Sequence, residues 1–148
     1  MKTNVNQTVT ASSAYSVGMA VGGIILLPAL VERTPTTCAI VDAFVIDKAG
    51  QAQPYDLLFF DAALVGTVTD RQAFNLHDSD RSKLLGFLSL TSTATVGTGG
   101  ILIGSTNIYK RLTLVGFGAR AVLVARGTPT FTNTTDISVQ VTSEQVYL

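Results

Sequence analysis

The sequence has 148 residues, the length of one domain with a single hydrophobic core. Ten Lys and Arg residues balance ten Asp and Glu residues, so the formal net charge is zero, and charged residues make up only 14% of the chain. This balance argues against binding to nucleic acid or to a membrane surface, because both partners attract an excess of positive charge. A single Cys and a single His exclude an intrachain disulfide and the usual four-ligand zinc site.

The chain begins with a polar segment. Residues 1–12 contain one Lys and offer only Val5 and Val9 for burial, so we do not expect a secretory signal there. We expect residues 1–12 to form a flexible N-terminal arm, either free or laid across a neighbouring subunit. Residues 13–148 are then expected to form the folded domain.

The most apolar stretch is residues 17–31, which carry no charge. It is shorter than the roughly 20 residues that a membrane-spanning helix needs. Gly22, Gly23 and Pro28 also disfavour a helix. We therefore expect two buried strands with a bend at Gly22 and Gly23, the first of which includes Tyr15, Val17, Met19 and Val21.

Alternating apolar and polar residues predict strands along the rest of the chain, separated by short turns that contain glycine. The predicted strands are residues 37–47, 55–61, 109–115, 119–126 and 136–142. Strand 119–126 has apolar residues on both faces and is expected to lie in the middle of a sheet. Residues 97–100 are typical of a hairpin loop. The pattern predicts an all-β fold, a single antiparallel sandwich or barrel of jelly-roll type.

Two details of this pattern concern individual residues. In strand 37–47, we expect Ile40, Phe44 and Ile46 on one face and the intervening valines on the other. Asp42 lies in the same apolar strand and is expected to face solvent or to pair with an arginine such as Arg120.

One short helix is predicted near residues 79–88. Asp78 or Asp80 could accept hydrogen bonds from the free amides of a first helical turn. Leu84, Leu85 and Leu88 would then share one face. Gly86 would weaken such a helix by about 1 kcal/mol, so we expect no more than one or two turns.

The residue types that support catalysis are scarce. Nucleophilic catalysis would have to use His77, because it is the only imidazole in the chain. Cys38 could be its nucleophile, but it lies in an apolar strand, where we expect a small buried residue. Carboxylate pairs for acid and base catalysis could be Asp42 with Asp47, Asp56 with Asp61, or Asp78 with Asp80. Asp56 and Asp61 flank a hydrophobic strand, and Asp78 and Asp80 precede the short helix, so we expect structural roles for them. We expect a structural role for Asp42 as well, facing solvent or paired with an arginine. We therefore assign no catalytic residue, and we expect that the chain is not an enzyme.

Binding of a metal or a cofactor is not expected either. His77, Asp78 and Asp80 are close in sequence, but they lack the spacing of a calcium-binding loop. The glycines at residues 97–100 do not match a dinucleotide-binding pattern, and no predicted helix follows them. We assign no cofactor, no metal ligand and no small-molecule substrate.

Three segments resemble small virion structural proteins of tailed bacteriophages. They are residues 55–62, residues 70–86 with the Asp-Arg-Gln-Ala-Phe and Asp-Ser-Asp motifs, and the closing run of residues 121–141. The resemblance covers about residues 37–142. Several proteins of this kind are head decoration, or cement, proteins, which are often trimeric.

The resemblance implies a protein of the virion, made in the host cytoplasm and located on the capsid exterior. It implies that the chain forms a homo-oligomer, expected to be a trimer, and binds the major capsid protein across the junctions between capsomers, without contacting DNA or a membrane. Two alternatives remain open. The chain could be a β-module of a tail, neck or fibre, or it could be a small β-barrel enzyme or ligand-binding module.

Overall fold

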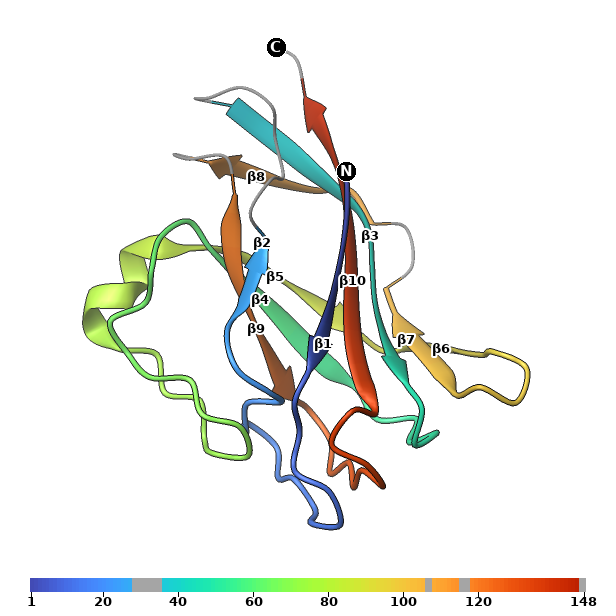
Figure 1. The fold of residues 1–148 in the computed structure, drawn as a ribbon. Coiled ribbons are helices and arrows are strands. Elements are labelled where there is room, and N and C mark those ends of the chain that lie inside the picture. Colours follow the sequence, from blue (N-terminus) through green and yellow to red (C-terminus); the bar gives the residue numbers. More distant parts are fainter. Residues whose placement is uncertain (28–35, 106–107, 115–117, 147–148) are drawn as a thin grey trace.

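The computed structural model describes residues 1–27, 36–105, 108–114 and 118–146. They form two antiparallel sheets and one short helix (Figure 1), which confirms the predicted all-β class. The elements in chain order are β1 (Lys2–Gln7), β2 (Ile25–Leu27), β3 (Thr36–Asp47), β4 (Tyr55–Phe60), the 3-10 helix η1 (Asp78–Lys83), β5 (Leu84–Leu90), β6 (Ser92–Thr95), β7 (Ile101–Gly104), β8 (Lys110–Leu114), β9 (Ala119–Ala125) and β10 (Ile137–Val146). No helix in these described ranges has the length and apolarity needed to cross a membrane.

The first sheet is built around the long strand β3. Its strand order is β1-β10-β3-β7-β6, and β8 pairs with the beginning of β3 on the same side as β7. The prediction for strand 136–142 is confirmed, because Ile137, Val139 and Val141 of β10 are buried and the residues between them are half-buried. The expected hairpin loop at residues 97–100 joins β6 to β7.

The second sheet has the order β2-β9-β4-β5 and packs against the first. As expected, β9 lies inside this sheet, between β2 and β4. One core fills the space between the sheets, and its ring contacts include Tyr15 against Phe131, with centroids 5.2 Å apart in an edge-on arrangement. Loops from different parts of the chain lie at the lower end of the sandwich in Figure 1.

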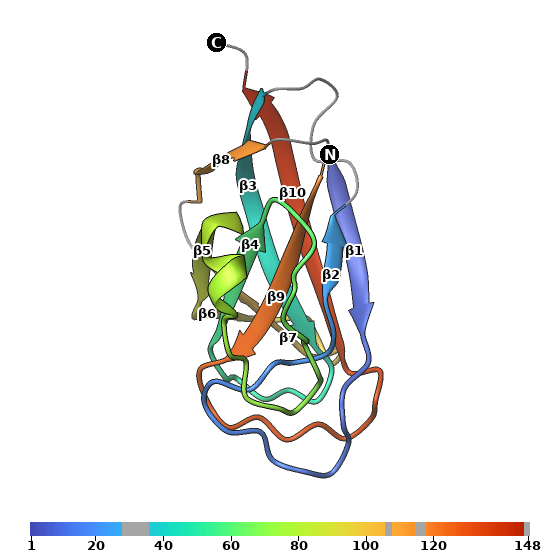
Figure 2. The same cartoon turned by 90° about the vertical axis from the view of Figure 1, so that its left-hand side faces the viewer.

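The outer face of the second sheet is partly covered by the chain itself. Leu64, Val68, Phe74 and Leu76, from the segment between β4 and η1, pack on a small cluster made by Phe60, Val122 and Val124. This cover explains why β9 is apolar on both faces. Figure 2 looks onto this side of the molecule, with η1 and the covering segment nearest the viewer. The cover lies over β9 and the end of β4, whereas Leu84 and Phe87 on the outer face of β5 are 37% and 55% exposed.

The N-terminal residues are placed differently from the sequence expectation. Residues 2–7 form β1, which pairs in register with β10 and so belongs to the sandwich rather than to an arm outside it. The Gln7 side chain is buried and donates hydrogen bonds to the backbone oxygens of Val21 and Gly23, at 3.1 and 3.0 Å. The polar sequence of β1 fits an edge strand with one exposed face.

The expected faces of β3 were wrong because the strand contains a bulge. In the pairing with β10, Asp42 lies opposite Thr142 and Ile40 opposite Ser143, so Val41 is the extra residue. The bulge reverses the alternation. Ile40, Ala43 and Val45 therefore face the core, whereas Phe44 and Ile46 are half-buried on the outer face.

The strand expected at residues 15–21 is not formed. The backbone there bonds irregularly to β9, with Gly18 N donating to Ala125 O and Val21 N to Leu123 O. The positive φ angles of Gly18 and Gly22, +92° and +77°, interrupt the pleat, and Val17 is 60% exposed. Beyond the bend only β2 is a strand, and residues 28–31 lie outside the described part.

The predicted helix is correct in its place and short length but wrong in its second half. The helical residues end at Lys83, and Leu84–Leu90 forms β5. Gly86 has a φ of +154°, which a helix cannot contain, and Leu90 points into the core as a strand residue. The expected leucine face of a helix is therefore divided between the two sides of a strand.

Candidate interaction face

The two residues considered for nucleophilic catalysis have separate structural positions. Cys38 is fully buried in β3 between β8 and β10, and burial raises the pKa of its thiol. His77 is exposed at the N-cap of η1, where its Nδ1 accepts a hydrogen bond from Ser79 N at 3.1 Å. His77 therefore provides the cap that was expected from an aspartate.

The residues of the His-Asp-Ser-Asp stretch point in different directions. Asp78 is exposed and forms an ion pair with Arg81 at 3.0 Å. Asp80 is buried, and it accepts hydrogen bonds from Val65 N, Gly66 N and Lys83 Nζ at 2.8 to 2.9 Å. Burial raises the pKa of Asp80, but these donors outweigh it and lower the pKa to about 2. Asp80 therefore fastens the covering segment to η1.

Over the described ranges, no group of three or more His, Cys, Asp and Glu side chains is arranged to hold a metal ion.

The other carboxylates considered for catalysis do not form reactive pairs. Asp42 is exposed on the first sheet, whereas Arg120 lies in β9 of the second. Asp47 is buried at the end of β3, where its carboxylate accepts hydrogen bonds from Ala49 N and Gln51 N at 2.8 and 3.1 Å. Burial raises the pKa of Asp47, and the nearby Asp136 adds to this effect. Asp136 in turn accepts hydrogen bonds from two backbone amides of its own loop.

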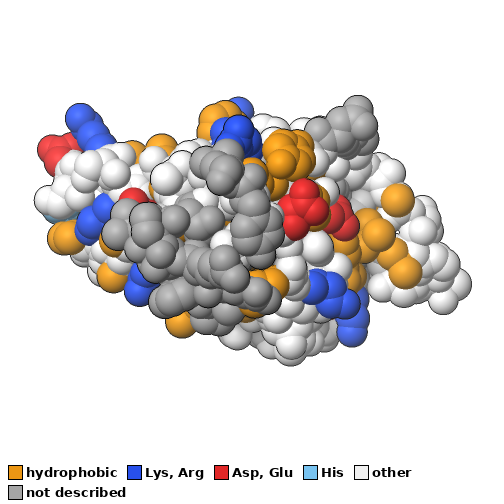
Figure 3. All heavy atoms as spheres, turned by 90° about the horizontal axis from the view of Figure 1, so that it is seen from above, with side chains coloured by type: hydrophobic (Ala, Val, Ile, Leu, Met, Phe, Trp, Pro, Cys, Tyr) orange, Lys and Arg blue, Asp and Glu red, His pale blue; other side chains and the backbone are white. Residues whose placement is uncertain are grey.

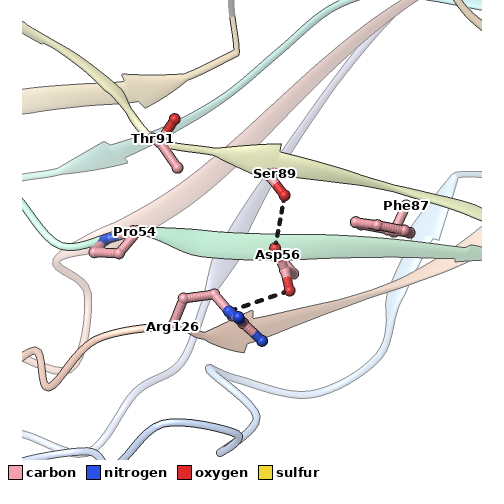
Figure 4. Close-up of a pocket in the computed structure, with 6 residues that line it drawn as sticks. All are labelled: Pro54, Asp56, Phe87, Ser89, Thr91 and Arg126. Atoms are coloured by element: carbon pink, nitrogen blue, oxygen red, sulfur yellow. Dashed lines mark hydrogen bonds and ion pairs between the residues drawn. The ribbon is translucent and has the colours of Figure 1, made fainter.

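Among these carboxylates, Asp56 lines a depression. Ser89 Oγ donates to Asp56 Oδ1 at 3.1 Å, and Arg126 Nε lies 3.5 Å from Oδ2 (Figure 4). The depression measures about 460 Å³ and is lined by Pro54, Asp56, Phe87, Ser89, Thr91 and Arg126. Its two opposite charges neutralise each other. The other side chains of this lining, Pro54, Phe87, Ser89 and Thr91, are uncharged.

Cross-strand pairing explains how the face around this depression is built. Leu58 of β4 lies opposite Phe87 of β5, and Asp56 lies opposite Ser89 in the neighbouring row. Leu58 and Asp56 are half-buried, whereas Phe87 is 55% exposed and Leu84, on the same strand, is 37% exposed. We call the outer side chains Asp56, Leu58, Leu84, Phe87, Ser89 and Arg126 the β5 face.

The β5 face includes part of a long run of the chain that has no charged residues. Residues 84–109 contain no Asp, Glu, Lys, Arg or His, and they include β5, β6 and β7. On the end of the molecule that Figure 3 shows, side chains of both charge signs are present. The uncharged run is a signal that the sequence alone contains. The exposure of Phe87 could not be read from the sequence, because it depends on β5 being a sheet edge outside the covering segment.

Comparisons with protein-family models, with curated proteins and with solved structures gave no match.

Proposed function

We propose that this chain is a structural protein of a phage virion, a head decoration protein that self-associates and binds the capsid exterior. In this proposal it bridges neighbouring capsomers and stabilises the expanded head against the pressure of packaged DNA. Its partners are copies of itself and the major capsid protein. The proposal combines the sequence resemblance with the surface described above.

The observation that carries the proposal is the exposed aromatic residue of the β5 face, which lies in a run of the chain without charged residues. Phe87 is 55% exposed on β5, opposite the half-buried Leu58, and residues 84–109 carry no charge. Aromatic residues and arginine are enriched at the centres of protein interfaces, where burial of a large apolar side chain contributes about 1.5–3 kcal/mol. Phe87 and Arg126 therefore fit a protein-binding face.

The buried carboxylates support a structural role. Asp47, Asp80 and Asp136 each accept hydrogen bonds from two backbone amides. Their oxygens are used to hold loops in place, and this rigidity suits a building block. The proposal assigns no catalytic residue, metal or cofactor.

The proposed mechanism relies on many weak contacts. A stable contact between two proteins buries about 1,200–2,000 Å² in total, so a small sandwich can contribute only a modest interface to each neighbour. Copies that are held together on a shell bind with a much higher effective affinity than one copy alone. The neutral charge balance keeps the chain from competing for the packaged DNA.

The direct test uses capsids of the parent phage that were expanded without this chain. Purified chain is added, bound chain is measured after sedimentation of the capsids, and the temperature at which they release DNA is recorded. The proposal predicts saturable binding and a higher release temperature. Failure to bind, binding only to tails, or binding without gain in heat resistance would contradict it.

The Phe87→Ser variant tests the β5 face in the same assay. We expect capsid affinity to fall about tenfold or more, because the loss of an apolar contact of about 1.5 kcal/mol corresponds to that factor. The matched control is Val17→Ser, which removes a side chain of similar exposure, 60%, between β1 and β2. Equal affinities for Phe87→Ser and the unmodified chain would exclude the β5 face from the interface.

A further inference from the structure

The outer edge of β6 is an open edge of the first sheet. β6 ends the strand order, with β7 on one side and, among the described strands, none on the other. All four of its residues are exposed. In Figure 1 the β6–β7 hairpin extends away from the rest of the sandwich at the right. An edge of this kind can accept another strand.

The hairpin geometry shows which backbone groups face outward. Val96 N donates to Gly100 O at 2.9 Å, and Thr95 lies opposite Ile101 in the next pair. Bonded and non-bonded pairs alternate in an antiparallel ladder. The backbone groups of Ala94 are therefore directed toward β7, and the N–H and C=O groups of Thr93 and Thr95 are directed toward the open side.

This edge lacks the features that usually prevent strand addition. Exposed edge strands are commonly protected by a charged side chain, a proline or a bulge. β6 has the sequence Ser-Thr-Ala-Thr, and its register with β7 is continuous from Ser92 to Thr95. The nearest charged residues in the sequence are Lys83 and Lys110. A strand with charged side chains finds no opposite charge at this edge. The β6 strand of a second copy, in contrast, presents an edge that is equally uncharged.

We propose that β6 pairs with β6 of a second copy, in antiparallel orientation about a two-fold axis beside Ala94. Thr93 then lies opposite Thr95 of the second copy and Thr95 opposite its Thr93, so that the outward backbone groups form four hydrogen bonds. Ala94 lies opposite Ala94 of the second copy, where the strands approach closely and a small side chain fits. Threonine pairs opposite one another also stabilise antiparallel strands.

The contact extends the first sheet across two copies. Four residues per strand bury less than the roughly 1,200 Å² of a stable complex, so the pairing depends on concentration in solution. It becomes strong when both copies are held on one shell, and in this respect the inference rests on the proposed function. The two-fold contact gives even-numbered assemblies in place of the trimer that the resemblance implies.

The Ala94→Cys variant tests the two-fold axis directly. Directly opposed residues in such a pair have Cα atoms about 4.5 Å apart, which permits a disulfide. We expect mild oxidation to give a covalent dimer of twice the 15.6 kDa chain mass, because the native Cys38 is buried. The control is Thr98→Cys at the hairpin tip, which should not cross-link. Equal cross-linking of both variants, or of neither, would overturn the inference.

A charge exchange at the same position provides the second measurement. Ala94→Lys and Ala94→Glu place like charges opposite each other, so each variant alone should sediment as a monomer. Their mixture should regain the dimer, because the charges are then complementary. If the unmodified chain forms oligomers that Ala94→Lys does not disrupt, or forms a trimer, the β6 pairing is wrong but self-association stands. If the unmodified chain stays monomeric at every concentration, the self-association in the proposed function also fails.

Discussion

Two buried tyrosines of the same core differ in whether their hydroxyl groups are hydrogen-bonded. Tyr15 is 1% exposed, and its hydroxyl accepts from Thr10 N at 2.8 Å and donates to the Asp70 carboxylate at 2.7 Å. Tyr55 is fully buried, and its hydroxyl has no hydrogen-bond partner among the described residues. Replacing each by phenylalanine removes one oxygen and leaves the ring in place, so the two variants isolate the value of the hydrogen bonds.

We expect opposite effects on the free energy of unfolding. Tyr15→Phe loses a bond to a charged group and leaves Thr10 N without its acceptor, which costs about 2–3 kcal/mol. Tyr55→Phe removes a buried hydroxyl that has no partner, so stability should be unchanged or rise by about 1–2 kcal/mol. For a chain of this length, the loss at Tyr15 corresponds to a fall in Tm of roughly 5–10 °C.

Urea unfolding followed by far-ultraviolet circular dichroism measures both variants against the unmodified chain. The burial that raises the pKa of Tyr15 to about 12 keeps its hydroxyl protonated at neutral pH. The comparison is therefore free of titration effects near pH 7. Equal losses in the two variants, or a larger loss for Tyr55→Phe, would refute the assignment of these hydrogen bonds.

Two further predictions concern the hairpin and the buried carboxylates. Gly100→Ala should lower the free energy of unfolding by about 3 kcal/mol or more, because φ is +125° and a Cβ would lie 2.5 Å from the Asp47 backbone oxygen. The control Gly97→Ala has φ +51° and open space around the Cβ, so thermal unfolding should show a loss of only about 1 kcal/mol. Because the pKa of Asp47 is raised in the folded state, its contribution to stability is complete below pH 3.8 and is lost as the pH rises through the folded-state pKa. The pKa of Asp80 is lowered, so its contribution is present above pH 3.8 and is lost as the pH falls toward about 2. Urea unfolding across this pH range measures the free energy of unfolding of each variant. Asp47→Asn should remove the decrease in stability that accompanies a rise in pH, and Asp80→Asn should remove the decrease that accompanies acidification. If stability depends on pH in the variants as it does in the unmodified chain, these assignments are wrong.

The strands that sequence reasoning placed correctly have strong local patterns. β10 alternates regularly and β9 is apolar from Ala121 to Ala125, so burial on one or both faces could be predicted. The faces of β3 could not, because the bulge at Val41 depends on the pairing with β10. The sequence also could not show that the segment before β2 bonds to both β9 and the covering segment. Long-range pairing, rather than local preference, decides these features.

The candidate surfaces could likewise be predicted from the sequence only in part. The uncharged run of residues 84–109, which contains β5, β6 and β7, can be read from the sequence. The exposed positions of Phe87 and Ala94 follow only from the sheet order, which places β5 and β6 at sheet edges. The roles of the carboxylates were likewise hidden, because Asp80 bonds to amides 14 and 15 residues earlier in the chain.

The mass of the unmodified chain in solution, measured by sedimentation velocity over a wide range of concentrations, tests the central claim most directly. A self-associating building block predicts a species heavier than the 15.6 kDa monomer, with a fraction that grows with concentration. A single 15.6 kDa species at the highest concentration reached would contradict the account.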